Sequence, residues 1–139
     1  MTTALDSTIL VAALVEAEPH HAASDALLDG ADVRIYAHAL SETFNTITGG
    51  RSGYRLSAAD ATRFLEESIL PNVEVVTLTP REMLAAMRES QSRGVRGAAI
   101  FDFLHLIAAK KAGATRLYTL NIRHFQSFRR PGDPEIVHP

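Results

Sequence analysis

Four polar side chains could form one metal-binding cluster: the carboxylates Asp6, Glu42 and Asp102 and the amide of Asn121. Together they would offer only oxygen ligands to a cation. Oxygen-only sites suit hard ions such as Mg²⁺ or Mn²⁺ rather than zinc. Carboxylates held close together repel one another unless a cation or protons neutralise them. The cluster therefore predicts a divalent metal site, provided that the fold brings the four residues together.

Taken singly, two of these residues have ordinary structural interpretations. Asp6 can act as the N-cap of a helix beginning at Ser7, and this role is compatible with a role in a site. Asn121 follows an apolar segment, where asparagine commonly serves as a turn or cap residue. Neither position indicates chemistry by itself.

The other two carboxylates stand near the starts of predicted helices. Asp102 lies in the apolar stretch 98–109, which is typical of a buried helix, so its charge needs a partner. That partner could be a cap interaction, an arginine or a cation, and an acidic residue in a first helical turn is also favoured by the helix dipole. Glu42 could point to solvent or along the sheet edge. The combination of four residues, rather than any one of them, predicts a site.

Short strands alternate with longer helical patterns along the chain. The predicted strands are 2–6, 32–36, 73–78 and 116–120, with 135–137 as a candidate fifth. The predicted helices begin at residue 7 and run to the 16–19 segment, then 20–28, 39–48, 57–70, 80–91 and 99–112. This alternation predicts a single α/β domain over 1–139, with a mainly parallel sheet and helices on both faces. Such sheets bind ligands beyond the carboxyl ends of their strands, where the strand order reverses.

Charge is unevenly distributed although the net charge is only −2. Residues 1–80 carry four Lys and Arg against eleven Asp and Glu, whereas residues 81–130 carry ten against three. A basic C-terminal half is what a phosphate-tracking surface would use, but solvated helix faces would give the same count. Arg93 and Arg96, in a glycine-rich loop before Asp102, are the predicted phosphate contacts.

Composition excludes several classes of protein. The sequence has no cysteine, so it can form neither disulfides nor thiolate metal sites. No apolar run is long enough to span a membrane, and the N-terminus lacks the pattern of a signal peptide. We expect a soluble cytoplasmic domain that does not associate with membranes.

In order and spacing, four segments resemble the PIN-domain nucleases, and within them most of all the VapC-type toxins of bacterial toxin–antitoxin pairs. The segments are 5–10 (LDSTIL), 41–42 (SE), 100–109 (IFDFLHLIAA) and 117–125 (LYTLNIRHF). The resemblance implies a five-stranded, mostly parallel sheet flanked by helices, divalent-metal-dependent cleavage of RNA, a homodimer and inhibition by a VapB-like antitoxin. Asp6, Glu42 and Asp102 match the acidic positions of the family. Asn121 and His124 stand where many members carry aspartate, so the site is less negative and a second metal is in doubt.

The hypothesis for the mechanism gives each residue a role. Asp6 and Asp102 anchor one Mg²⁺ or Mn²⁺, Glu42 holds or deprotonates the attacking water, and Asn121 orients water or the scissile phosphate. His105 could bond near the site, although a core or surface histidine is the more common case. Two rival functions remain open: a structure-specific DNA nuclease of the same fold, and a non-catalytic domain that binds RNA or a partner.

Overall fold

A five-stranded sheet forms the centre of the computed structural model, which describes residues 1–139. The strands are β1 Thr3–Leu5, β2 Val33–Tyr36, β3 Glu74–Val76, β4 Arg116–Tyr118 and β5 Glu135–Val137. Their spatial order is β3-β2-β1-β4-β5, and all four neighbouring pairs are parallel. Because β1 is the central strand and its neighbours are β2 and β4, the order reverses at β1. Ligand sites of open α/β sheets lie at this kind of switch point.

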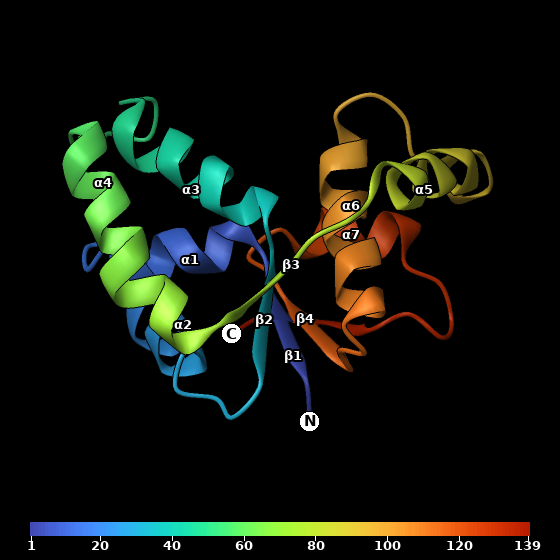
Figure 1. Ribbon diagram of the computed structural model, residues 1–139, viewed down its shortest axis with the longest axis horizontal. Helices are drawn as coiled ribbons and strands as arrows, with labels where there is room; N and C mark the ends of the chain where they lie inside the picture. Colours follow the sequence, from blue (N-terminus) through green and yellow to red (C-terminus); the bar gives the residue numbers. More distant parts are fainter.

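Seven α-helices cover the two faces of the sheet (Figure 1). On one side lie α1 Ser7–Leu14, α2 His21–Leu27, α3 His38–Thr48 and α4 Ala58–Phe64, the last continued by a π-turn over Leu65–Ile69 and a 3₁₀-turn over Leu70–Asn72. On the other side lie α5 Pro80–Arg93, α6 Ala99–Lys111 and α7 Ile122–Phe128. The predicted fold class is confirmed, and the sheet is parallel throughout.

Alternating side chains of the strands pack into two separate hydrophobic clusters. Ala4 of β1 and Leu117 of β4 join the cluster under α5, α6 and α7, which is centred on Phe103 and Phe125. The next residue of β1, Leu5, joins the cluster under α1 and α3. This two-residue period is the geometry of a strand covered on both faces. Each fully buried Phe or Leu side chain contributes about 1.5–3 kcal/mol to folding.

Three of the seven α-helices, α1, α4 and α5, begin at a side-chain cap. Ser57 accepts a hydrogen bond from the amide of Asp60 at 3.1 Å, and Thr79 forms a reciprocal capping box with Glu82 ahead of α5. Each such cap contributes about 1 kcal/mol. The helix α7 was not predicted, because its seven residues are too few to show a helical period.

The helix α5 is two residues longer than predicted. It continues through Arg93 and ends at Gly94, whose φ of 69° is left-handed and is adopted readily by glycine. The segment predicted as a basic loop therefore begins in the helix, which changes the interpretation of Arg93 below.

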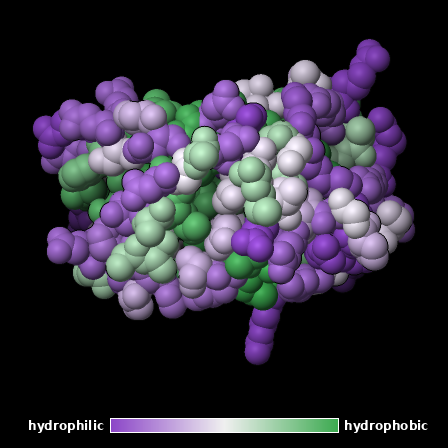
Figure 2. All heavy atoms as spheres, turned by 90° about the horizontal axis from the view of Figure 1, so that it is seen from below, coloured by the Kyte–Doolittle hydropathy of each residue, from purple (hydrophilic) through white to green (hydrophobic).

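The amino ends of the strands lie on the lower side of the molecule in Figure 1. Figure 2 shows this face from below, with hydrophobic atoms interspersed among hydrophilic ones over the side of α1–α4.

No helix has the length and apolar character needed to cross a bilayer.

Candidate active site

Asp6 lies directly after β1 and is buried, with 2 % of its surface exposed. Its Oδ1 atom accepts hydrogen bonds from the amides of Thr8 at 3.0 Å and Ile9 at 3.3 Å, so Asp6 is the N-cap of α1. The hydroxyl of Thr8 donates to the same oxygen, and the hydroxyl of Thr119 donates to Oδ2 at 2.5 Å. The cap interpretation is therefore correct, and it holds the carboxylate at the carboxyl edge of the sheet.

The ionised form of Asp6 is disfavoured by its surroundings. Burial raises the pKa of Asp6 above its ordinary value, although the positive charge of His105 and the hydrogen bonds of Thr119, Thr8 and Ile9 act in the opposite direction. A carboxylate with a raised pKa gains stability from a nearby cation. The Asp6 carboxylate is thus held in a fixed orientation, and a cation bound beside it would stabilise its ionised form.

Two threonine hydroxyls connect the ends of the two central strands. The Thr119 hydroxyl, which donates to Asp6, also accepts a hydrogen bond from the amide of Asn121 at 2.9 Å. The Thr8 hydroxyl accepts one from the amide of Leu120 at 2.9 Å. These contacts set the position of the β4–α7 junction relative to Asp6. Sequence reasoning missed both threonines; the available signal was a hydroxyl two residues after Asp6 and another two residues before Asn121.

Asn121 occupies the N-cap position of α7 without acting as a cap. Its side chain makes no cap hydrogen bond, and the residue is exposed. The side-chain amide of Asn121 is consequently available to a ligand at this edge of the sheet. The turn or cap interpretation explains its place in the chain but leaves the side chain unused.

Asp102 lies in the first turn of α6, and 25 % of its side chain is exposed. Its Oδ2 atom is 3.3 Å from Nδ1 of His124, at the start of α7. Of the partners considered for this carboxylate, neither an arginine nor a cap interaction is present. The histidine contact leaves its other oxygen free to bind a ligand.

Glu42, on α3, contacts a buried histidine of α6. Nε2 of His105 donates to Oε1 of Glu42 at 2.6 Å, while 34 % of the glutamate side chain stays exposed. The imidazole is 3 % exposed and meets the ring of Tyr36 edge-on, with ring centroids 5.4 Å apart. His105 is therefore a core histidine that also bonds at the site.

One buried imidazole, that of His105, is bonded to Glu42 and feels the charges of the other two carboxylates. Burial alone would lower the pKa of His105, but the hydrogen bond to Glu42 and the charges of Glu42, Asp6 and Asp102 outweigh it, so the pKa is raised. The carboxylates that follow β1 and lie on α3 and α6 are thus the charged neighbours of one imidazole.

The side chains of the candidate site fit a hydrated Mg²⁺ or Mn²⁺ ion better than a metal ion enclosed by protein ligands. No group of three or more Asp, Glu and His side chains is clustered tightly enough to form a ready-made metal cage. Mg²⁺ rarely uses such a cage: it keeps several waters and takes one or two protein carboxylates. The buried Asp6 and the partly exposed Asp102 supply carboxylate oxygens of that kind.

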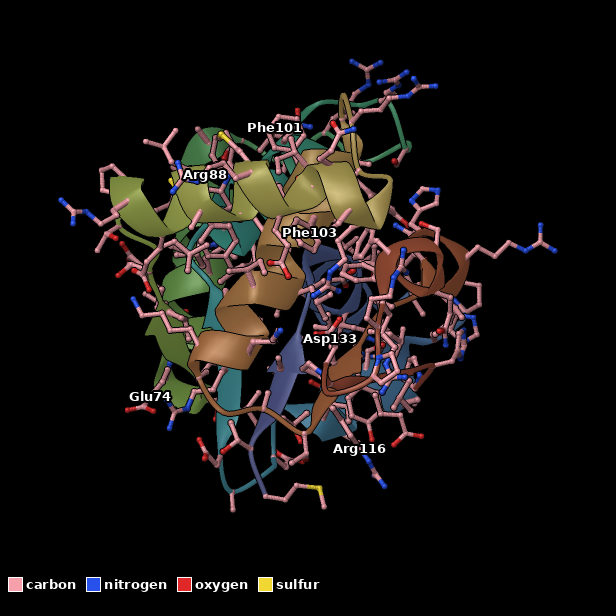
Figure 3. All side chains as sticks on the ribbon, turned by 90° about the vertical axis from the view of Figure 1, so that its right-hand side faces the viewer. Glu74, Arg88, Phe101, Phe103, Arg116 and Asp133 are labelled. Atoms are coloured by element: carbon pink, nitrogen blue, oxygen red, sulfur yellow. The ribbon has the colours of Figure 1, made fainter.

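The structure corrects the expectation for Arg93. This residue is 7 % exposed, and its guanidinium binds Asp133 at 2.5 Å and Glu89 at 3.0 Å. It also donates to the carbonyl of Phe128 at 2.9 Å and lies over the ring of Phe103. Figure 3 shows Asp133 beside α6, below Phe103 in this view. Since both terminal nitrogens of the guanidinium are bonded inside the protein, Arg93 is a structural residue rather than a phosphate contact.

Arg96, in contrast, is exposed and forms no ion pair. It lies in the loop between α5 and α6, three residues before the helix that carries Asp102. The prediction that it contacts phosphate is compatible with this position.

Parallel strand order and acidic side chains at the switch point define a class of α/β domain with a site at its carboxyl edge. Within that class the chain belongs to the PIN-domain family, which matches residues 3–131. The resemblance inferred from the four sequence segments is confirmed.

Known proteins of this kind match almost the full length of the chain. Ribonuclease VapC27 of Mycobacterium tuberculosis is 26 % identical over 134 residues, covering 96 % of this chain and 95 % of that protein. The crystal structure of VapC20 from the same organism, described as a Sarcin-Ricin loop cleaving toxin, has a TM-score of 0.71 at 19 % identity. It is matched over 96 % of this chain and 100 % of its own. A second structure is that of VapBC2 from Rickettsia felis bound to a DNA fragment from its promoter. It has a TM-score of 0.68 at 18 % identity, and the match covers 99 % of this chain and 98 % of its own. These structures share the fold.

Proposed function

We propose that the chain is a divalent-metal-dependent endoribonuclease and the toxin of a toxin–antitoxin pair. The observation that carries the proposal is the position of three carboxylates: Asp6 at the end of β1, Glu42 bonded to the buried His105, and Asp102 in the first turn of α6. The charges of all three raise the pKa of His105. Membership of the PIN-domain family and the similarity to Ribonuclease VapC27 over nearly the whole chain support it.

Asp6 and Asp102 are the proposed ligands of Mg²⁺ or Mn²⁺. When bound, the ion supplies Lewis-acid stabilisation of the charge that develops on the phosphodiester, and it favours ionisation of the attacking water. The fixed position of Asp6 suits this role, since four hydrogen bonds hold its carboxylate before any ion arrives. Asp102 presents its less constrained carboxylate from the first turn of α6.

Glu42 is the proposed general base. Its carboxylate is accessible to solvent on one side and held by His105 on the other, so it can accept a proton from water in a defined orientation. The free amide of Asn121 donates to the scissile phosphate or orients the water. Attack by water, rather than by the ribose 2′-hydroxyl, leaves a 5′-phosphate on the product. Arg96 is the proposed contact to the phosphate backbone.

The partners and setting follow from the same family likeness. We propose RNA as the substrate, a VapB-like antitoxin as the inhibitor, and a homodimer in the cytoplasm. The choice of RNA is supported by the names of two relatives, a ribonuclease and a Sarcin-Ricin loop cleaving toxin.

A cleavage assay with one preparation tests this function. Purified protein is incubated with a structured RNA and with the DNA of the same sequence, in Mg²⁺, in Mn²⁺ and in EDTA. We expect metal-dependent cleavage of RNA alone, with 5′-phosphate ends. Asp102→Asn should reduce the rate by at least about 10³-fold while its circular dichroism spectrum stays unchanged.

Each rival function predicts another result. Cleavage of the DNA but not of the RNA would identify a DNA nuclease of the same fold. Full activity in Asp102→Asn would reject the assignment of that residue. No cleavage of either nucleic acid and no binding of Mg²⁺ or Mn²⁺ would favour a non-catalytic binding domain.

A further inference from the structure

A pocket of about 390 Å³ opens beside two of the candidate site residues, Asp102 and Asn121. It lies between the start of α6 and the helix α7, so its walls come from the two elements that follow the loop of Arg96 and the strand β4. Its volume falls in the range of pockets that hold a small organic group. The proposed mechanism uses Asp102 and Asn121 but leaves the other lining residues of the pocket without a role.

The rest of the lining is suited to an uncharged ring more than to a phosphate. Ala98 and Ala99 form one side, and Phe128 lies at its base. No lysine or arginine lines the pocket, and the carboxylate of Asp102 would repel an anion. A planar apolar surface with polar edges is the kind of group that such walls accept.

Polar atoms around the rim could read the edge of such a ring. The Asn121 amide has a donor and an acceptor that no protein group uses. His124 leaves 69 % of its side chain exposed, and its contact with Asp102 sets the position of the imidazole. The Ser127 hydroxyl donates to the carbonyl of His124 at 2.6 Å, so its oxygen remains free to accept.

We propose that this pocket receives one unstacked nucleobase of the RNA strand, next to the phosphodiester that is cleaved. The inference rests on the proposed ribonuclease function and adds how the same site selects its substrate. Sequence-specific RNA recognition works mostly on single-stranded bases, which stack on aromatic or histidine rings and bond through their edges. His124 supplies the ring, and the Ser127 hydroxyl and the side-chain oxygen of Asn121 supply acceptors for the base edge. The N–H group of Asn121 keeps its proposed role toward the phosphate or water. A base in this pocket requires that the target be a loop or a single strand.

Nucleotide titration tests the pocket without any metal or cleavage. Backbone amide spectra of the ¹⁵N-labelled protein in EDTA are recorded with the four ribonucleoside 5′-monophosphates, and with ribose 5-phosphate as the probe that lacks a base. We expect at least one nucleotide to shift the amides of Asn121, His124 and Ser127, and ribose 5-phosphate to leave them unchanged. Equal shifts with ribose 5-phosphate, or no shifts with any nucleotide, would overturn the inference.

Substitutions at His124 separate stacking from the contact with Asp102. His124→Ala removes the ring, and we expect KM for a single-stranded RNA to rise about tenfold while kcat stays within about twofold. His124→Phe keeps a stacking ring without the contact to Asp102, and it should restore KM. Gln126→Ala, an exposed position of α7 outside the pocket, is the matched control.

The possible failures can be told apart. If His124→Ala and His124→Phe lower kcat equally without changing KM, His124 acts only through Asp102 and the inference is wrong. If the wild-type protein cleaves RNA but no nucleotide shifts the pocket amides, this inference fails and the proposed function stands. If nucleotides bind the pocket but no RNA is cleaved, the base site stands and the proposed function fails.

Discussion

His105 and Glu42, 63 residues apart in the chain, are joined by a hydrogen bond of 2.6 Å between Nε2 and Oε1. The imidazole is buried in the core, and its other nitrogen, Nδ1, has no partner. The glutamate is held at one oxygen and accessible at the other. This pairing gives Glu42 a fixed orientation that a surface glutamate on a helix would lack.

Two substitutions of His105 should differ because of this bond. Glutamine can place its amide near the position of Nε2, whereas asparagine is shorter and reaches only toward the position of Nδ1. We expect His105→Asn to lower kcat by about 10²-fold, as for loss of an oriented base, and His105→Gln to retain most activity. The measurement is steady-state cleavage of RNA, with urea unfolding as a check on stability. Equal losses in both variants, matched by equal losses of stability, would make His105 a core residue only.

Asp6→Asn should stabilise the metal-free protein while abolishing cleavage. The pKa of Asp6 is higher in the folded protein than in the unfolded chain. The free energy of unfolding therefore contains a contribution from protonated Asp6 at low pH, and this contribution is lost as the pH rises through the folded-state pKa. A neutral asparagine keeps the cap to α1 and removes the buried charge. We expect Tm at pH 7 in EDTA to rise by about 4 °C, equivalent to about 1 kcal/mol.

Asp6→Ala is the control for that prediction. Alanine removes both the charge and the cap, and loss of a cap costs about 1 kcal/mol, so its Tm should lie below that of Asp6→Asn. A lower Tm in Asp6→Asn than in the wild type would show that the ionised carboxylate is well stabilised by its hydrogen bonds alone.

The general features of the site could be predicted from local patterns. Asp6 ends an apolar segment and precedes a helix, and Asp102 opens an apolar helix, so their places at element boundaries follow from the neighbouring residues. The rule that parallel strands gather ligands at their carboxyl ends then brings the two together.

The contacts that refine the site could not be predicted in this way. His105 is one polar residue in an apolar helix, and its partner Glu42 lies on another helix far away in the sequence. Thr119 has the appearance of an ordinary strand residue until the sheet order places it beside Asp6. Arg93 was predicted to lie in a loop because the preceding helix was expected to end at residue 91. The helix continues for two more residues, and Arg93 is buried in the core instead of facing solvent. Partners distant in the sequence leave no local signal.

The buried ion pair of Arg93 and Asp133 should dominate the acid stability of the α5–α7 side. Burial raises the pKa of Asp133, but hydrogen bonds from Arg93, Lys110 and the amide of Arg130 outweigh it and hold the pKa at about 2. The stability from this carboxylate is therefore present above its ordinary pKa of 3.8 and is lost as pH falls toward about 2. We expect Asp133→Asn to cost about 3 kcal/mol at pH 7, because it leaves Arg93 buried with an incomplete partner.

Urea unfolding between pH 7 and pH 2 measures this effect. The difference between wild type and Asp133→Asn should shrink as the pH falls below 3.8. Glu89→Gln is the matched control, since this partner of Arg93 is 41 % exposed and its pair contributes about 0–1 kcal/mol. A loss in Glu89→Gln as large as that in Asp133→Asn would contradict the assignment.

Arg96→Ala should weaken RNA binding without affecting stability. The side chain is exposed and unpaired, so its removal costs the fold little. Loss of one phosphate contact lowers the slope of log affinity against log salt by about 0.7 for a single strand. Fluorescence anisotropy of a labelled RNA at several salt concentrations, in EDTA, measures this slope. An unchanged slope would remove Arg96 from the RNA surface.

Binding of Mn²⁺ to the protein without RNA tests the central claim, that Asp6 and Asp102 share one hard cation. Isothermal titration at pH 7.5 compares the wild type with Asp6→Asn, Asp102→Asn and the control Asp29→Asn, a residue of the α2–β2 loop. We predict one site in the wild type and in Asp29→Asn, with affinity at least about tenfold weaker in each of the other variants. Unchanged Mn²⁺ affinity in both Asp6→Asn and Asp102→Asn would contradict the account.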